Sequence, residues 1–218
     1  IGSDTWQQYI MNYTSIVNHL RDGDFALWDF TNGLGVNMFN FNLFDPFLML
    51  LYGIGVVLGP AHMLIYVNVI QVLKILAAGA AFYWFLSQFT FSRQAKLAVS
   101  YVYGLNGFLL VWGQHYQFGT AVVYLPLLFL FCEKFIRKEK GRRFFPVMVF
   151  LCGIYSVYFT YMCLAATGLY LFFRVLMPEN MKTGERARLF LAGCGQMILG
   201  LGMSLAVFLP MAAVLLNV

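Results

Sequence analysis

Long stretches without any charged residue divide this 218-residue chain. The uncharged segments are 46–73, 75–92, 97–132, 144–173 and 189–218. Each is about as long as, or longer than, the roughly 20 residues that a helix needs to cross a bilayer. Because the apolar runs are long and do not alternate, they favour helices over a closed barrel. The pattern predicts an all-α, polytopic transmembrane helix bundle.

The composition supports a membrane protein. Hydrophobic residues make up 61% of the chain and charged residues only 11%, whereas a soluble domain carries about 25% charged residues. The net charge of +5 does not point to nucleic acid, because the charges are separated by sign along the chain. Residues 1–45 hold five acids and one base, whereas 91–96, 133–143 and 174–188 are basic. By the positive-inside rule the three basic patches are cytoplasmic and the acidic N-terminal stretch is extracytoplasmic.

The predicted sides of the charged segments determine the expected topology of the chain. We expect 62–90 to run inward, 97–113 to run outward and 117–136 to return to the basic segment 133–143. Residues 144–173 begin and end at basic patches, so they predict a hairpin of two short helices that turns near residues 155–158. Residues 189–216 then cross outward, with Gly193, Gly195, Gly200 and Gly202 permitting close helix contact. A full span at 46–59 would invert every basic patch, so we interpret that segment as a shallow or re-entrant helix on the outer side.

Two regions follow from this topology. Residues 1–41 form an extracytoplasmic loop with short interfacial helices, and residues 42–218 form the transmembrane helical domain. Because the polar N-terminal stretch is predicted to lie outside, we expect a preceding helix to anchor it. The chain therefore reads as a part of a longer protein.

Asp4 is the first candidate for chemistry. It lies close to the expected membrane exit, and its neighbours Gln8 and Tyr9 can hydrogen-bond a polyol. A carboxylate in this position could act as a general base on a sugar hydroxyl. The alternative is a structural role, because an aspartate before a helix is a good N-cap.

Lys74 is the one charge deep inside an apolar run. A charge within the membrane is expensive and usually marks a functional site, and a cation here would suit a phosphate or pyrophosphate. Asn68 and Gln71 extend a polar stripe on the same predicted face. The alternatives are a structural pair with Asp45 or another acid, or snorkelling toward the surface.

Three further residues are candidates for substrate binding. His115 lies at an outer turn and could donate to a phosphate oxygen, or it could belong to an interfacial turn with aromatic neighbours. Arg21, among four aspartates of the outer loop, could bind an anion or pair with Asp22 or Asp24. Asp29, in a glycine-rich turn, could contact a substrate or have a structural role.

Signals for other chemistry are absent from the sequence. It contains no Walker loop, no HExxH and no GxSxG, and its four cysteines lie in apolar runs without metal-ligand spacing. No cofactor is indicated. A divalent metal could bind Asp4 and Asp29, but nothing in their spacing requires one.

Several motifs, in this order, resemble the bacterial YfhO-like membrane protein family over all 218 residues. They are Gly2-x-Asp4-x-x-x-Gln8-Tyr9, Leu20-Arg21-Asp22-Gly23-Asp24-x-x-x-Trp28-Asp29, Gly33-x-Gly35-x-Asn37, Asp45-Pro46-Phe47, Leu73-Lys74, the Pro126 helix running into Glu133, and Tyr158-x-x-Tyr161. The resemblance implies a GT-C-like fold, in which a membrane glycosyltransferase takes a sugar from a polyprenyl-phosphate carrier. It also implies an extracytoplasmic glycan or teichoic-acid acceptor, as in lipoteichoic acid glycosylation, at the bacterial cytoplasmic membrane.

In that class an acidic residue of the first outer loop serves as base, and Asp4 matches this position. The resemblance thus implies that Asp4 takes the proton of the acceptor hydroxyl. In this reaction Lys74, Arg21 and His115 are candidates to hold the departing phosphate. Two other functions stay open. A transporter or flippase for lipid-linked glycans would need an intramembrane acid to pair with Lys74. A non-catalytic accessory subunit would use the outer loop only for docking.

Overall fold

The computed structural model describes residues 5–24, 28–30, 35–37, 43–111, 113, 115–116, 118–177 and 181–216. Helices dominate this part of the chain, and its two strands are two-residue segments, β1 (Trp28–Asp29) and β2 (Val36–Asn37), which pair antiparallel. The predicted all-α polytopic bundle is confirmed. Among the residues that the structure describes, four helical stretches are long and apolar enough to cross a membrane, namely Pro60–Leu86, Gly119–Ile136, Val157–Leu176 and Thr183–Ala213.

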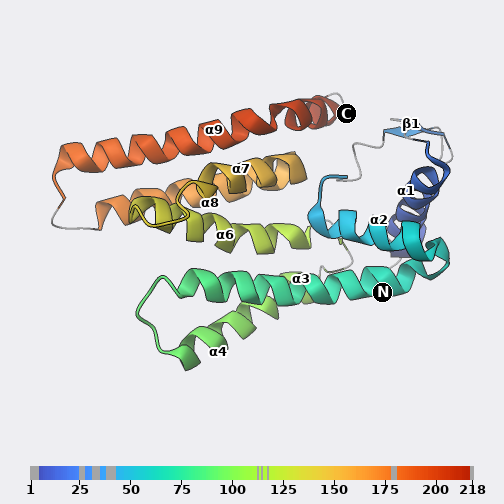
Figure 1. Ribbon diagram of the computed structural model, residues 1–218, viewed down its shortest axis with the longest axis horizontal. Helices are drawn as coiled ribbons and strands as arrows, with labels where there is room; N and C mark the ends of the chain where they lie inside the picture. Colours follow the sequence, from blue (N-terminus) through green and yellow to red (C-terminus); the bar gives the residue numbers. More distant parts are fainter. Residues whose placement is uncertain are drawn as a thin grey trace.

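The N-terminal region forms a small helical unit at one end of the bundle (Figure 1). A five-residue π-helix, η1 (Thr5–Tyr9), leads into α1 (Ile10–Asp22), which ends at Gly23 in the left-handed conformation. The apolar helix α2 (Pro46–Leu58) begins at Asp45, whose carboxylate accepts hydrogen bonds from the backbone N–H groups of Phe47 and Leu48. Buried residues of α1, α2 and the first half of α3 form one hydrophobic cluster, which includes Tyr13, Ile16 and Leu51.

α2 has 13 residues and is a separate helix, shorter than the helices that could cross a membrane. It ends at Gly59, whose φ of 86° lies in the region that favours glycine. The short 3-10 helix η3 (Pro60–His62) follows and continues into α3 (Met63–Leu86). The chain thus turns between α2 and α3 at a Gly-Pro step.

The segment 97–113 differs from the expected single span. It consists of α4 (Arg93–Gly104) and α5 (Gly107–Val111), separated at Leu105 and Asn106. The Asn106 side chain accepts a hydrogen bond from the backbone N–H of Leu109 at 2.9 Å and donates to the carbonyl of Tyr103 at 2.6 Å. An asparagine that bonds to its neighbouring backbone competes with helical hydrogen bonds, so it ends one helix and starts the next.

The remaining helices are α6 (Gly119–Ile136), α7 (Phe144–Tyr155), α8 (Val157–Leu176) and α9 (Thr183–Leu216). α7 and α8 form the predicted hairpin, whose turn is the extended residue Ser156. Only α7 is short, as expected; α8 has 20 residues and is long and apolar enough to cross a membrane. Buried side chains of α6, α7 and α8 form the largest hydrophobic cluster, which includes Phe145, Tyr155 and Leu171. α9 begins earlier than expected, at Thr183.

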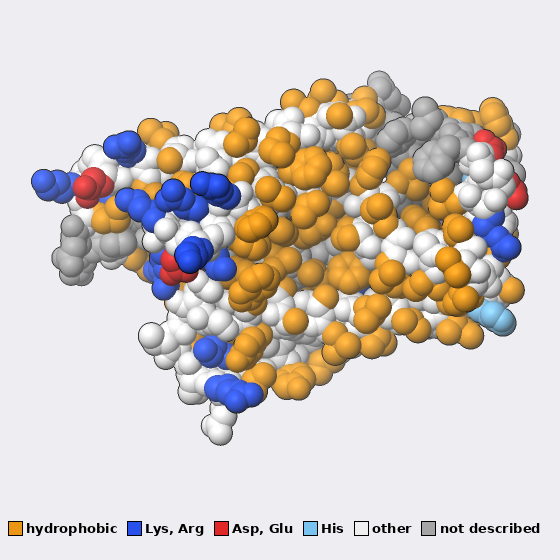
Figure 2. Space-filling view, in the orientation of Figure 1, with side chains coloured by type: hydrophobic (Ala, Val, Ile, Leu, Met, Phe, Trp, Pro, Cys, Tyr) orange, Lys and Arg blue, Asp and Glu red, His pale blue; other side chains and the backbone are white. Residues whose placement is uncertain are grey.

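The loops after α3, α6 and α8 lie together at one end of the helices, and α1 and β1 lie at the other (Figure 1). Lys and Arg side chains gather at the end with these loops, and the surface between the two ends is largely hydrophobic (Figure 2). The charge asymmetry of the sequence is therefore also an asymmetry of the structure. Which end faces the cytoplasm, and whether residues 1–41 lie outside, stay predictions.

Candidate functional site

A buried ion pair lies where the N-terminal unit meets the long helices. The ammonium of Lys74, on α3, is 3.6 Å from a carboxylate oxygen of Asp45, the residue that caps α2, and both side chains are fully buried. The hydroxyl of Thr120, in the first turn of α6, donates to the same oxygen at 2.6 Å. Lys74 also donates to the backbone carbonyl of Tyr116. The pair thus joins α2, α3, α6 and the loop before α6.

The surroundings of Lys74 are aromatic and polar. Its ammonium lies over the ring of Phe47, 5.5 Å from the centroid. One turn earlier, Gln71 donates to the carbonyl of Leu109 at 3.2 Å, while its side-chain oxygen is buried without a hydrogen-bond partner in the described part of the chain. Asn68 does not extend this stripe, because it is exposed and bonds to Leu64 of its own helix.

The sequence left three roles open for Lys74, namely phosphate binding, an ion pair and snorkelling, and the structure pairs it with Asp45. Its charge is therefore balanced by a carboxylate, and its hydrogen bond to Tyr116 holds the loop that precedes α6. Thr120 was not predicted, since a threonine at the start of an apolar helix carries no signal of its own. Asp45 was named only as a possible partner.

Tyr9 and His115, both predicted site residues, are brought together by the fold. The Tyr9 hydroxyl and His115 Nδ1 are 2.7 Å apart, although 106 residues separate them in the chain. The Tyr9 ring meets the Tyr116 ring edge to face at 5.9 Å, and His115 stacks on Phe118 at 5.1 Å. These contacts attach the N-terminal segment to the loop before α6, whose Tyr116 carbonyl also accepts the hydrogen bond of Lys74.

A second tyrosine of this unit has an unusual environment. Tyr13 is almost fully buried, and its hydroxyl has no hydrogen-bond partner among the residues that the structure describes. Burial, and then the charge of neighbouring groups that include Asp45, raises the pKa of Tyr13 well above its usual value. Burial also raises the pKa of Tyr52, which packs against Tyr13. Both phenols are therefore neutral and can act only as hydrogen-bonding groups.

Asp29 belongs to a different contact group. It is buried in β1, accepts a hydrogen bond from Ser15 at 2.6 Å and lies 3.4 Å from Nε2 of His19. These contacts fix the strand pair onto α1. Within the described residues they link Asp29 to α1 and not to Lys74.

The other predicted residues are more exposed. Gln8 is exposed at the side chain. Arg21 is exposed and its guanidinium lies over Gly59, at the end of α2. Within the described segments, Arg21 forms no ion pair with Asp22 or Asp24, and Asp24 instead lies 3.3 Å from His19. Asp4, the predicted base, lies outside the described residues and directly precedes η1 in the sequence.

Glu133 is the centre of a second buried charge cluster, at the opposite end of α6. Its carboxylate accepts hydrogen bonds from Arg137 at 2.6 Å, from Arg174 at 2.5 and 2.9 Å and from Tyr170 at 2.7 Å. The two arginines lie over the ring of Phe89. The cluster ties α6 to α8 and to the turn after α3.

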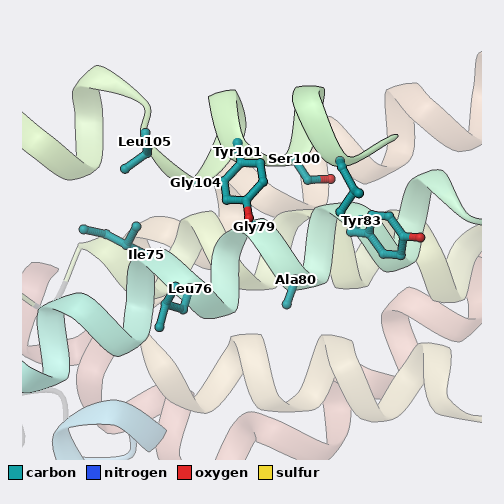
Figure 3. A pocket seen from close by; sticks show the side chains of 10 residues that line it. Ile75, Leu76, Gly79, Ala80, Tyr83, Ser100, Tyr101, Gly104 and Leu105 are labelled. Carbon is teal, nitrogen blue, oxygen red and sulfur yellow. The ribbon is translucent and has the colours of Figure 1, made fainter. Parts of the chain in front are cut away.

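A groove of about 390 Å³ lies between α3 and α4. Figure 3 shows side chains of both helices around it, and Gly79 and Gly104 allow the two backbones to approach. Its lining is apolar except for Ser100 and two tyrosines. None of the predicted site residues lines this groove. No group of three or more His, Cys, Asp or Glu side chains that could hold a metal ion occurs among the described residues.

The fold and these clusters define a polytopic α-helical membrane protein in which buried ion pairs fasten the helices at both ends. Residues 1–218 match the family described as "Bacterial membrane protein YfhO", and the chain belongs to this family. It is similar to the "Uncharacterized protein YfhO" of Bacillus subtilis (strain 168), with 29% identity over 161 residues, which are 72% of this chain. The match covers 18% of the relative's length. No solved structure matches the chain.

Proposed function

We propose that the protein is a membrane glycosyltransferase, which moves a sugar from a polyprenyl-phosphate carrier to an extracytoplasmic cell-wall or lipid-linked glycan. The observation that carries the proposal is the connection of the N-terminal segment to the α5–α6 loop through Tyr9 and His115, directly beside the buried pair of Lys74 and Asp45. This arrangement holds the segment that follows Asp4 at the end of the bundle opposite the basic loops.

In the proposed reaction, the Asp4 carboxylate takes the proton of an acceptor hydroxyl. The acceptor oxygen attacks the anomeric carbon, the bond between that carbon and the carrier phosphate breaks, and the configuration inverts. General-base assistance of this kind contributes about 10²- to 10⁴-fold. The departing phosphate takes the electron pair of the broken bond.

Cations near the site would stabilise the charge on that phosphate, which is usually the largest catalytic contribution in such a site. Arg21 is exposed and unpaired with its neighbouring aspartates within the described segments, and His115 is partly exposed. These two are our candidates for contact with the phosphate. Lys74 is fully buried and bonded to Asp45 and Tyr116, so we assign it the role of positioning the loop that carries His115. Gln8, whose side chain is exposed, is our candidate for binding the sugar or its acceptor. Tyr9 and Asp29 are buried and act as positioning residues, through His115 and through α1.

One observation favours a second function, a flippase for lipid-linked glycans. Such a carrier needs an intramembrane acid to pair with a buried lysine, and Asp45 is placed beside Lys74 in this way. An accessory role without chemistry would use the same outer unit only as a docking surface.

Reconstitution of the full-length protein in liposomes distinguishes these functions. The donors are a panel of polyprenyl-phosphate hexoses and N-acetylhexosamines, and the acceptor is a purified teichoic acid. The proposal expects sugar to become bound to the acceptor when donor and acceptor are on the same face. Movement of the donor between leaflets without transfer would support the flippase. The absence of both transfer and donor movement would contradict both functions.

A further inference from the structure

A second cavity, of about 570 Å³, lies at the basic end of the bundle. Its walls come from the end of α6, the loop that leads to α7 and the first turns of α9. Three basic side chains line it, Lys138, Arg142 and Arg188, together with one acid, Glu185. Part of the remaining wall is apolar and includes Phe135 and Leu189. The cavity is therefore amphipathic and carries an excess of positive charge.

Four neighbouring cations at this end are occupied by other contacts. Arg137 and Arg174 bond to Glu133, Lys134 lies over the ring of Trp84, and Arg186 donates to the carbonyls of Met181 and Leu176. The three basic side chains of the cavity differ, because within the described residues none of them forms an ion pair. Their charge is thus available to a ligand.

The backbone of Lys138 provides an independent observation. Its φ of 57° is the only positive φ at a non-glycine residue in the described part of the chain. The position follows the end of α6, where the left-handed conformation commonly closes a helix and glycine is the usual residue. A non-glycine residue there is strained, and such strain often occurs where a side chain is needed for function. The lysine places a cation on the cavity at a cost that glycine would avoid.

We propose that this cavity binds the phosphate head group of an anionic glycerophospholipid, with the acyl chains along the apolar surface beside Phe135 and Leu189. Basic pockets between helices at the cytoplasmic side of a membrane protein suit such head groups. The cavity lies at the end of the bundle where Lys and Arg gather, next to the largely hydrophobic surface between the two ends (Figure 2). A bound lipid would connect the α6–α7 loop to α9.

The test compares two adjacent arginines of the full-length protein. Arg142 lines the cavity and Arg143 does not, although both are exposed. The purified proteins are taken from nanodiscs with equal parts of phosphatidylglycerol and phosphatidylcholine, and retained lipids are counted by native mass spectrometry. We expect the wild type to retain phosphatidylglycerol selectively. Arg142→Gln should lower this retention about fivefold, which corresponds to about 1 kcal/mol for one basic side chain near the surface, and Arg143→Gln should leave it unchanged.

A third variant, Lys138→Gly, separates binding from folding. It removes a cation and also removes the backbone strain, so phosphatidylglycerol retention should fall while the melting temperature does not. Equal effects of Arg142→Gln and Arg143→Gln, or equal retention of both lipids by the wild type, would overturn the proposal. Binding of glycerol phosphate alone in detergent, with no lipid retained, would assign the site to a soluble anion and would overturn it too.

Discussion

Buried charged and polar groups set the local structure at both ends of the bundle. Asp45 caps α2 with one carboxylate oxygen and meets Lys74 and Thr120 with the other, so a single side chain serves a helix end and an ion pair. Breaking a buried pair by removing one partner leaves an uncompensated charge, which typically costs about 3–5 kcal/mol. The pair therefore makes a direct prediction.

Lys74→Met should destabilise the protein by about 3 kcal/mol or more, because Asp45 keeps its charge without a cation. Adding Asp45→Asn should restore most of this loss, since the asparagine oxygen can still cap α2 while its amide nitrogen donates to the Thr120 hydroxyl. Thermal unfolding of the purified protein in detergent measures both. A double variant no more stable than Lys74→Met would show that Asp45 is not the partner that matters.

Tyr9 and Tyr13 of the N-terminal unit allow a matched pair of variants. Tyr9→Phe removes the hydrogen bond to His115 and should cost about 1 kcal/mol. Tyr13→Phe removes a buried hydroxyl that has no partner among the described residues, so the free energy of unfolding should stay within about 0.5 kcal/mol of the wild type or rise. Equal losses in denaturant titrations of the two variants would contradict the assigned contacts.

At this scale the sequence predicted single residues better than their partners. Lys74 could be recognised because one charge in an apolar run is conspicuous. The contact between Tyr9 and His115 could not be predicted, since it depends on the packing of segments 106 residues apart. Thr120 and Tyr13 carry no pattern in the sequence, and the role of Tyr116 is played by its backbone carbonyl, which every residue type shares.

The helices follow the sequence closely where charge patches or Gly-Pro steps bound them. The turn at Ser156 was predictable, because a single span cannot begin and end at basic patches that lie on the same side. The break between α4 and α5 was missed, since the segment 97–113 carries no charge and a single asparagine decides its course. Only a contact between side chain and backbone shows this break.

Four glycines of α9 were predicted to permit close helix contact. In the structure two of them face a neighbouring helix closely and two do not. A Cβ at Gly200 would overlap the carbonyl of Pro146 and the side chain of Val149, both on α7, and a Cβ at Gly193 would overlap Leu171. Gly195 and Gly202 have open space instead. The close approach of α7 and α9 thus depends on Gly200 of α9, and also on Gly153 of α7, where a Cβ would overlap Ser204.

Gly200→Ala should therefore lower the stability by about 1–3 kcal/mol, because the helices must move apart or strain. Gly202→Ala is the control: alanine meets nothing there and should leave stability unchanged or raise it by up to about 1 kcal/mol through helix propensity. Melting temperatures in detergent compare the two. A loss for Gly202→Ala as large as for Gly200→Ala would contradict this packing of α9.

For the whole molecule, the separation of charge is the main determinant of orientation. The loops after α3, α6 and α8 are basic and lie at one end, while residues 21–24 lie at the other. The positive-inside rule then predicts that the basic end faces the cytoplasm and that α1 lies outside. This assignment can be checked in cells.

Single cysteines at the positions of Arg21 and Lys140 report the two sides. Cys194, the partly exposed native cysteine, is first replaced by serine, since the other three are buried. A membrane-impermeant maleimide should label the cysteine at 21 in intact cells and the one at 140 only after permeabilisation. Equal labelling of both in intact cells would contradict the orientation.

The central claim is that a carboxylate of the outer segment removes the proton of a sugar acceptor, and Asp4 is the residue that it names. The most direct measurement is sugar transfer from a polyprenyl-phosphate donor by full-length Asp4→Asn, beside Asp22→Asn, which makes the same charge change at an exposed position of α1. We predict that Asp4→Asn lowers transfer about 10²- to 10⁴-fold at normal membrane abundance, while Asp22→Asn transfers like the wild type. Wild-type transfer by Asp4→Asn would contradict the claim, and a loss of abundance in place of turnover would assign Asp4 to helix capping.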